Sequence, residues 1–383
     1  MKICFLSNFY NHHQDPISRS LFRITDGQYI FFATSALEIE QKKLGYIQYK
    51  RTFVVNYFQN EKAANTHILD SDVVILGAAE KIHINDILSS GKLIFRYSER
   101  IYKKLPKWYQ MPARAIKYWF KGGRFENIYL LCASAFTSAD YHRTRTFEKR
   151  AYKWGYFPET NKYDIESLLS AKEKTKILWV GRFLDWKHPD DVLKVAKRLR
   201  DDGYAFSVDI GGIGEMEQQL KTMVAEMQMQ DYVNFLGAIP SDQVRGYMEQ
   251  VGIYLFTSDR YEGWGAVLNE SMNSGCAVVA SHAIGAVPYL VKNNENGLVY
   301  HSGNVDELYE KVKYLLNNPS EQERLGKAAY ETITGEWNAE VAAERLINLS
   351  KHLLAGEKYP DLYQTGPCSR AEIIKDDWIY EYE

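Results

Sequence analysis

The chain has 383 residues, which is enough for two or three domains of about 150 residues each. Hydrophobic residues make up 45% and charged residues 25%, a balance that excludes a disordered chain and a small disulfide-stapled protein. The formal net charge of −2 excludes an overall basic surface for nucleic acid and leaves room only for a local basic patch.

Short apolar runs alternate with helical patterns in the first part of the chain. These runs predict strands at residues 3–7, 29–33, 53–57, 73–77, 93–97 and 128–133. Strands that are apolar throughout are typical of a parallel sheet covered on both faces. We therefore expect residues 1–160 to form a doubly wound α/β domain.

A basic and aromatic segment lies within this first domain. Residues 100–124 contain no acid and eight bases, which are Arg100, Lys103, Lys104, Lys107, Arg114, Lys117, Lys121 and Arg124. Five aromatic residues are interleaved with them: Trp108, Tyr109, Tyr118, Trp119 and Phe120. Bases with interfacial aromatics suit docking to an anionic membrane surface. The alternatives are a nucleic-acid surface and a solvated helix whose aromatic side faces the core.

No segment approaches the roughly 18 apolar residues of a spanning helix, and the first 14 residues hold too few apolar residues for a signal peptide. The four cysteines are not arranged as C-x-x-C, so we expect them to be buried thiols in a reducing compartment. The expected location is cytoplasmic, at most peripheral at the inner face of the membrane. No metal site is expected.

Residues 151–163 contain Gly155 and Pro158 and are expected to be a linker. A second series of strands is predicted at 176–181, 206–211, 232–237, 253–257, 277–281 and 297–300, which gives a second doubly wound domain over 161–340. Residues 341–383 are expected to form a C-terminal helix and tail that cross back toward the first domain. Ligands of such sheets bind at the carboxyl ends of the strands, so we expect the binding site in the loops that follow the strands.

Four loops of the second domain hold informative residues. After the strand at 176–181, Arg182 and Lys187 place two cations five residues apart, which suits a diphosphate; a solvated turn is the alternative. The next loop has Gly212 and Gly214, a G-x-G that lacks the third glycine of a nicotinamide-dinucleotide fingerprint. The third is the strand end at 234–237, which includes Leu236 and whose backbone could pair with a base edge.

The fourth loop runs from Glu262 to Glu270. Gly263 and Gly265 leave backbone amides bare at an expected helix N-terminus, which makes an anion site. Two carboxylates beside an anion site make sense if the ligand also carries hydroxyls, because carboxylates accept hydrogen bonds from vicinal diols. The alternative is that Glu262 caps the helix and Glu270 is solvated.

Taken together, these loops resemble the retaining glycosyltransferases of family 4 (glycosyl transferases group 1), which have the GT-B fold. The matching elements are G-R-x(4)-K at 181–187, G-x-G at 212–214, FLG at 235–237, E-x(7)-E at 262–270 and the strand and loop over 275–288. The resemblance implies two Rossmann-like domains that face a cleft: an acceptor-binding domain first, a nucleotide-sugar-binding domain second, and C-terminal helices that return to the first.

The resemblance also implies roles for particular residues. Arg182 and Lys187 would grip the diphosphate of a nucleotide-sugar donor, UDP-linked as first choice, and Glu270 would bind the ribose hydroxyls. Glu262 would hold the donor sugar. The other expected donor-binding residues are Gly181, Gly212, Gly214, Leu236, Gly263, Trp264, Gly265, Ala266, Val267 and Leu268.

In the first domain, His13 with its neighbour His12 after the first strand, and Glu99 after the strand at 93–97, are the candidates for the reaction site. The alternatives are a capped turn for the histidines and an ion pair with Arg100 for Glu99. The expected catalytic set is thus Glu262, Lys187, Arg182, Glu99 and His13.

The implied reaction moves a sugar to an acceptor hydroxyl on a sugar or lipid-linked glycan, with retention and without a protein nucleophile, metal or cofactor. Synthesis of a cell-surface polysaccharide or glycolipid is the expected setting, and no nucleic-acid partner is expected. The alternatives are a non-catalytic nucleotide-sugar-binding subunit of a partner transferase, and a GT-B epimerase or phosphorylase.

Overall fold

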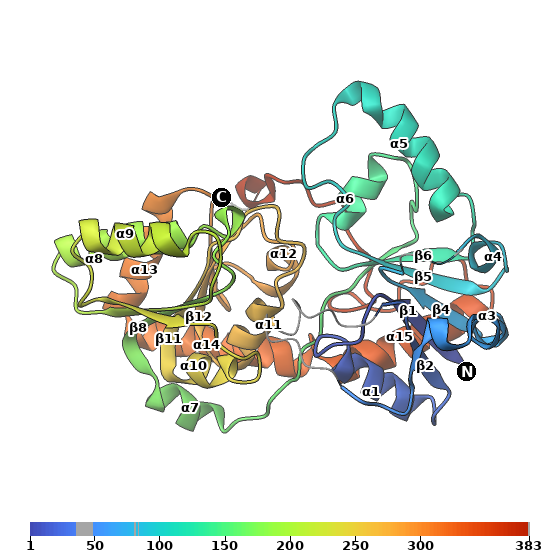
Figure 1. Cartoon of the computed structure of the whole chain (residues 1–383), viewed down its shortest axis with the longest axis horizontal. Helices are drawn as coiled ribbons and strands as arrows, with labels where there is room; N and C mark the ends of the chain where they lie inside the picture. The colour runs from blue at the N-terminus through green and yellow to red at the C-terminus, as the bar shows by residue number, and fades with distance from the viewer. Residues whose placement is uncertain (36–48, 80–81, 83, 382–383) are drawn as a thin grey trace. The chain divides into compact units, whose positions relative to one another are not determined.

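Two parallel β-sheets organise the chain, and each belongs to a separate compact unit. The computed structural model describes residues 1–35, 49–79, 82 and 84–381 (Figure 1). Unit 1 consists of Met1–Glu159 and Glu336–Trp378, and unit 2 consists of Thr160–Gly335 with the C-terminal end from Ile379. The expected boundaries after residues 160 and 340 lie one and five residues from these divisions.

In its described residues, unit 1 has a seven-stranded parallel sheet in the order β3-β2-β1-β4-β5-β6-β7. Its strands are β1 (Ile3–Ser7), β2 (Tyr29–Ala33), β3 (Val54–Asn56), β4 (Val73–Leu76), β5 (Leu93–Ser98), β6 (Ile128–Cys132) and β7 (Ala151–Lys153). Every residue of β1, β4 and β6 is buried, as expected for strands with helices on both faces.

The helices of unit 1 come from both ends of the chain. They are α1 (Asp15–Ile24), α3 (Glu61–Asp70), α4 (Asn85–Leu88), α5 (Met111–Tyr118), α6 (Thr137–His142) and α15 (Ala339–Leu354). Three single-turn elements accompany them: η1 (Tyr57–Gln59), η2 (Trp108–Gln110) and the π-helical η3 (Trp119–Gly123).

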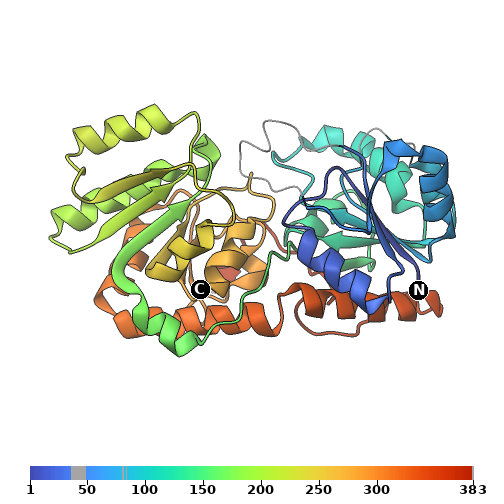
Figure 2. The same ribbon diagram turned by 60° about the horizontal axis from the view of Figure 1, so that its bottom comes forward.

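Helix α15 returns to unit 1, which confirms the expected course of the C-terminal helices. The side chain of Asn338 caps its first turn by accepting a hydrogen bond from the Val341 amide at 3.0 Å. Figures 1 and 2 both show α15 alongside α1, and Arg23 of α1 forms an ion pair with Glu340 of α15.

The expected linker at 151–163 is wrong at its start, because Ala151–Lys153 form strand β7. This strand pairs with β6, and the C-terminal tail lies along its other side. The Lys153 amide donates to the Ser369 carbonyl at 2.8 Å, and the Cys368 amide donates to the Lys153 carbonyl at 2.8 Å. A three-residue strand gives too little periodicity to be seen in the sequence, and the tail that protects its edge is distant along the chain.

In its described residues, unit 2 has a six-stranded parallel sheet in the order β10-β9-β8-β11-β12-β13. Its strands are β8 (Glu173–Val180), β9 (Ser207–Gly211), β10 (Val233–Gly237), β11 (Val251–Phe256), β12 (Ala277–Ser281) and β13 (Leu298–Tyr300). Two sheets of Rossmann-like type confirm the expected α/β class.

Helices pack around this second sheet and bury its apolar strands. They are α7 (Ile165–Ala171), α8 (Pro189–Asp201), α9 (Glu217–Glu226), α10 (Val244–Gln250), α11 (Ala266–Asn273), α12 (Val287–Leu290), α13 (Val305–Asn317) and α14 (Pro319–Gly335), with the 3-10 turns η4 (Asp185–Lys187) and η5 (Trp378–Glu381). Helix α8 begins at a proline and buries its apolar side, which includes Val192, Leu193 and Leu199.

All four cysteines are buried and free. Among the described residues, no helix combines the length and the apolar character that crossing a bilayer requires.

Candidate active site

Backbone hydrogen bonds in unit 2 join the loops that follow β8, β9 and β10, which the sequence predicts to bind a ligand. The Gly181 amide, after β8, donates to the Gly211 carbonyl at the end of β9 over 3.0 Å. The Gly212 amide then donates to the Gly237 carbonyl at the end of β10 over 2.7 Å. The structure therefore brings the G-R-x(4)-K, G-x-G and FLG motifs together at the carboxyl end of the sheet, where Leu236 lies half-buried.

Glycine is required in this edge because the loops approach closely. Gly212 has φ of +140°, and a Cβ atom there would lie 1.8 Å from the Gly181 carbonyl oxygen. A Cβ atom on Gly214 would lie 2.5 Å from the Phe183 carbonyl oxygen. These two glycines pack the β9 loop onto the β8 loop and so position the backbone that carries Arg182.

The predicted residues Lys187 and Glu262 form an ion pair between two loops. The Lys187 Nζ lies 2.6 Å from the Glu262 Oε2, and both side chains are largely buried, at 13% and 14% exposed. The Ser258 hydroxyl donates to the same carboxylate oxygen at 3.1 Å. The Thr257 hydroxyl donates to the Lys187 carbonyl at 2.6 Å, which ties η4 to the loop after β11. A cation and an anion are thus held together at the end of β8 and β11.

Arg182 and Glu270 are the two predicted charged residues without a hydrogen-bond or ion-pair partner among the described residues. Within the described residues, neither side chain makes a hydrogen bond or an ion pair, and Arg182 is exposed. Burial raises the pKa of Glu270 to about 7, although the nearby Arg245 guanidinium opposes that rise. Both groups are therefore open to a ligand, one as a hydrogen-bond donor and one as an acceptor.

The start of α11 presents the bare amides that the sequence predicts. Gly265 caps the helix with φ of +90°, and a Cβ atom there would lie 2.4 Å from Cζ of the Phe256 ring. Within the described residues, the amides of Gly263, Gly265, Ala266 and Val267 donate to no acceptor. Amides at a helix N-terminus carry partial positive charge and bind anions.

Two of the expected donor-binding residues have side chains in the core of unit 2. Trp264 is 1% exposed, and its Nε1 donates to the Asn269 side chain at 2.9 Å. Leu268 is fully buried, and its amide donates to the Gly265 carbonyl at 2.9 Å. Trp264 and Leu268 therefore shape the turn that exposes the neighbouring amides, and their side chains do not line its surface.

In unit 1, the predicted residues His13 and Glu99 meet through Tyr156. The His13 ring stacks on the Tyr156 ring with centroids 5.7 Å apart, and the Tyr156 hydroxyl donates to the Glu99 Oε1 at 2.5 Å. The ring of His12 lies 3.9 Å from that of His13. Burial lowers the pKa of His12 to about 4 and, with the charge of His12, the pKa of His13 to about 3, so both rings are neutral near pH 7. The alternative for Glu99, an ion pair with Arg100, is not formed among the described residues: Arg100 pairs with Asp376, and Glu99 lies 3.9 Å from the Lys103 ammonium.

Sequence reasoning missed Tyr156, because it follows strand β7, which the sequence does not reveal. Burial raises the pKa of the Tyr156 hydroxyl well above its usual value, so it stays a proton donor to Glu99. Tyr254 was also missed. Its hydroxyl donates to the Val180 carbonyl at 3.3 Å, and the negative charges of Glu270 and Glu262 raise its pKa further than burial alone.

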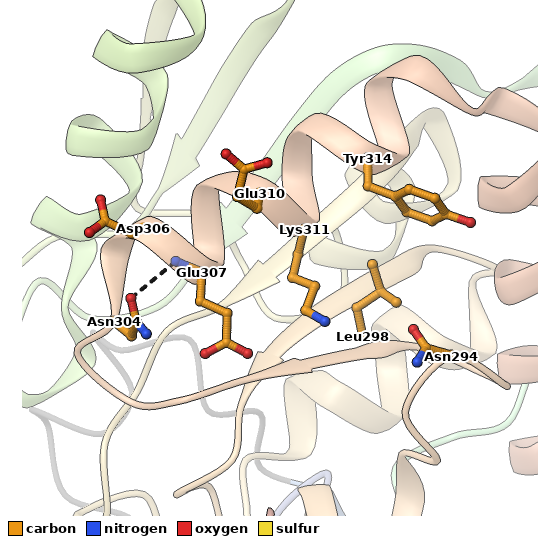
Figure 3. Close-up of a pocket in the computed structure, with 8 residues that line it drawn as sticks. All are labelled: Asn294, Leu298, Asn304, Asp306, Glu307, Glu310, Lys311 and Tyr314. Carbon is orange, nitrogen blue, oxygen red and sulfur yellow. Dashed lines mark hydrogen bonds between the residues drawn. The ribbon is translucent and has the colours of Figure 1, made fainter. Parts of the chain in front are cut away.

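A pocket of about 590 Å³ on unit 2 lies away from these loops in the chain (Figure 3). Its lining residues are Asn294, Leu298, Asn304, Asp306, Glu307, Glu310, Lys311 and Tyr314. Asn304 accepts a hydrogen bond from the Glu307 amide at 3.1 Å as the cap of α13. None of the predicted site residues lines it, and the described residues contain no cluster suited to a metal ion.

Comparison with known proteins finds a family model that matches most of unit 2. The model described as glycosyl transferases group 1 matches residues 161–332. An uncharacterised glycosyltransferase of Haemophilus influenzae is 32% identical over 177 residues, covering 44% of this chain and 49% of that protein. The amylovoran biosynthesis glycosyltransferase AmsK of Erwinia amylovora is 26% identical over 200 residues, covering 51% of this chain and 49% of that protein. The matches thus span about half the length of these relatives.

The fold extends beyond the part that is similar in sequence. The solved structure of Anabaena Alr3699/HepE in complex with UDP has a TM-score of 0.65 to this chain at 15% identity. The alignment covers 92% of this chain and 100% of that one. The expected GT-B fold is therefore confirmed for the chain.

Proposed function

We propose that this chain, whose residues 161–332 match the model of the group 1 glycosyltransferases, is a retaining glycosyltransferase that acts in the synthesis of a cell-surface polysaccharide or glycolipid. The observation that carries the proposal is the set of charges in unit 2. The Lys187–Glu262 ion pair, the unpaired Arg182 and Glu270 and the bare amides of α11 match the needs of a sugar nucleotide. The relative AmsK is named for amylovoran biosynthesis, and the HepE structure holds UDP, which supports both the setting and the donor class.

The donor is a nucleotide-diphosphate sugar, with UDP as the first choice. Arg182 and Lys187 bind the diphosphate, since a guanidinium and an ammonium together offset its charge. Glu270 accepts hydrogen bonds from the ribose hydroxyls, and Leu236 with the end of β10 contacts the base. Glu262 and the amides of Gly263–Ala266 hold the donor sugar.

The reaction breaks the bond between the sugar C1 and the diphosphate oxygen and forms a bond from C1 to the acceptor oxygen. Negative charge develops on the departing diphosphate, where Arg182, Lys187 and the α11 amides stabilise it. Positive charge develops on the sugar, where the Glu262 carboxylate stabilises it. The acceptor approaches the face that the diphosphate leaves, and its proton passes to a diphosphate oxygen, so configuration is retained.

The acceptor side is assigned to unit 1. We place acceptor or reacting-sugar contacts at His13 and Glu99, whose positions are linked by Tyr156. His13 is neutral near pH 7, so it contributes hydrogen bonds without adding a positive charge. The acceptor class is a sugar or lipid-linked glycan.

The test is a panel of UDP-, GDP- and ADP-sugars given to the purified chain. A donor first identified by thermal shift is then incubated with and without glycan acceptors, and release of the nucleoside diphosphate is measured. Slow hydrolysis or transfer, unchanged by a chelator, is expected. Binding without release would instead favour a non-catalytic subunit, and conversion of the donor without an acceptor would favour an epimerase or phosphorylase.

A further inference from the structure

Unit 1 exposes an unusual concentration of large apolar side chains around α5. Within the described residues, 13 large hydrophobic side chains are exposed, and six of them fall between residues 105 and 120. These six are Leu105 (46%), Trp108 (85%), Tyr109 (57%), Ile116 (60%), Trp119 (46%) and Phe120 (53%). We call this set the α5 surface. Contiguous exposed apolar patches of this kind mark interaction sites.

The α5 surface is one stripe along a continuous helical segment. Elements η2, α5 and the start of η3 follow one another from Trp108 to Phe120, and the backbone leaves the helical conformation at Lys121 and Gly122. Ile116 lies eight residues after Trp108, and Trp119 and Phe120 lie three and four residues after Ile116, so these side chains share one side of the segment. Tyr118 packs against the core of unit 1, so the alternative of a core-facing aromatic side holds for that residue. The rings of Trp108, Trp119 and Phe120 are exposed instead.

Another side of the segment is fastened to unit 1, so the stripe is held outward. The Tyr118 ring packs edge-on against the Tyr141 ring at 5.3 Å, and Gly122 is buried. Arg150 donates to the Gly123 carbonyl at 2.8 Å. Figure 1 shows α5 at the edge of unit 1, away from the sheet. The exposed stripe is therefore a fixed feature of a well-packed helix.

Positive charge surrounds the stripe. The segment 100–124 carries eight bases and no acid, although the whole chain has a net charge of −2. Lys107 lies 5.9 Å from the Tyr109 ring, and the Arg124 guanidinium lies 5.1 Å from the Phe120 ring. Cations over interfacial rings can reach phosphate groups while the rings enter an apolar layer.

We propose that the α5 surface docks on an anionic lipid bilayer. The apolar stripe enters the boundary between headgroups and acyl chains, and the flanking bases bind the anionic headgroups. Leu105 and Ile116 have no ring to stack on a base, so the stripe suits hydrocarbon better than single-stranded nucleic acid. Arg100 is buried and paired with Asp376, and the other seven bases of the segment oppose pairing with a second copy of the same surface. This proposal does not depend on the proposed sugar transfer.

The experiment measures binding of the full chain to vesicles of phosphatidylcholine alone and of phosphatidylcholine with phosphatidylglycerol. Co-sedimentation is expected with the anionic vesicles only, and it weakens at least tenfold between about 0.1 M and about 1 M NaCl because salt screens the bases. Trp108→Ser with Phe120→Ser should reduce partitioning at least tenfold. Lys107→Gln with Lys117→Gln should reduce it and flatten the salt dependence.

The matched control is Phe58→Ser with Tyr359→Ser, which removes two exposed aromatic side chains elsewhere in unit 1 (43% and 47% exposed). It should bind like the wild type. All variants are first checked for an unchanged melting temperature, since every substituted side chain is exposed. No binding of the wild type to anionic vesicles, equal losses in the control, or binding of a single-stranded oligonucleotide in place of vesicles would overturn the proposal.

Discussion

The ammonium group of Lys187 and the carboxylate of Glu262 lie 2.6 Å apart, although 75 residues separate them in the chain. Both side chains are largely buried, so each group depends on the other for most of its neutralisation. A donor that brings its own diphosphate would compete with Glu262 for Lys187 and would release Glu262 toward the sugar.

Lys187→Met and Glu262→Gln should each lower kcat/KM at least tenfold, which corresponds to about 1.4 kcal/mol of transition-state stabilisation. Lys187→Met leaves a carboxylate without its cation, so we expect its melting temperature to fall by a few degrees at most, because Ser258 still donates to Glu262. The double variant should recover the melting temperature and stay inactive. Activity near the wild-type level in either single variant would contradict the assigned roles.

Donor affinity should rise as pH rises through about 7, because the ionised Glu270 carboxylate accepts hydrogen bonds from a diol on both oxygens and more strongly than the protonated acid does. We expect the Kd for UDP to be roughly tenfold higher at pH 5.5 than at pH 8, as measured by calorimetry. Glu270→Gln is the matched control, since protonation of the UDP phosphate affects binding to both proteins equally. A difference between the two pH slopes therefore comes from Glu270. Equal pH slopes for the two proteins would argue against a contact with Glu270.

The raised pKa of Glu270 also makes the free energy of unfolding depend on pH, and this free energy should fall as pH rises, whereas donor affinity should rise. Glu270 titrates at about 4.5 when unfolded and at about 7 when folded, so its contribution to stability is complete below about 4.5 and is lost as pH rises to about 7. Glu270→Gln should therefore be more stable than the wild type at pH 8 in urea denaturation, while the two differ less at pH 5. A variant that is less stable at pH 8 would contradict this.

Gly212→Ala should destabilise the chain by more than about 2 kcal/mol, because the new methyl group would meet the Gly181 carbonyl and the backbone has a positive φ. Gly246→Ala is the control, since its Cβ would meet nothing within 4 Å and it lies in α10. That substitution should stabilise the chain by about 0.5–1 kcal/mol. Denaturant midpoints measure both, and equal effects would show that the loop edge tolerates a side chain.

Tyr156→Phe should lower sugar transfer to an acceptor several-fold and leave donor hydrolysis and donor affinity nearly unchanged, since it removes the hydroxyl that donates to Glu99. Tyr314→Phe also removes a tyrosine–glutamate hydrogen bond, from Tyr314 to Glu321, and should change neither rate. If both variants lose the same activity, or if Tyr156→Phe loses donor affinity instead, unit 1 does not contact the acceptor as proposed.

The sequence was sufficient for most of the fold because the central strands are continuous apolar runs. The runs at 3–7, 29–33 and 277–281 coincide with β1, β2 and β12. Strand β7 was not predicted, because its three residues pair with the distant C-terminal tail and tertiary pairing leaves no local sequence pattern.

The site was predictable to the extent that its residues follow strands. Parallel strands bring their carboxyl ends to one edge, so the loops after β8, β9, β10 and β11 had to lie near one another. The pairing of Lys187 with Glu262, the inward side chains of Trp264 and Leu268 and the role of Tyr156 depend on rotamers and packing, which spacing along the chain does not determine.

The return of residues 336–378 to unit 1 has a consequence for biosynthesis. Translation delivers all of Thr160–Gly335 before the helix α15 that completes the earlier unit. The later-encoded sheet can therefore close while the first sheet still lacks the helix beside α1 and the tail beside β7. A chain released before its last 50 or so residues would carry all of Thr160–Gly335 but an N-terminal unit with an apolar flank uncovered, a natural target for chaperones.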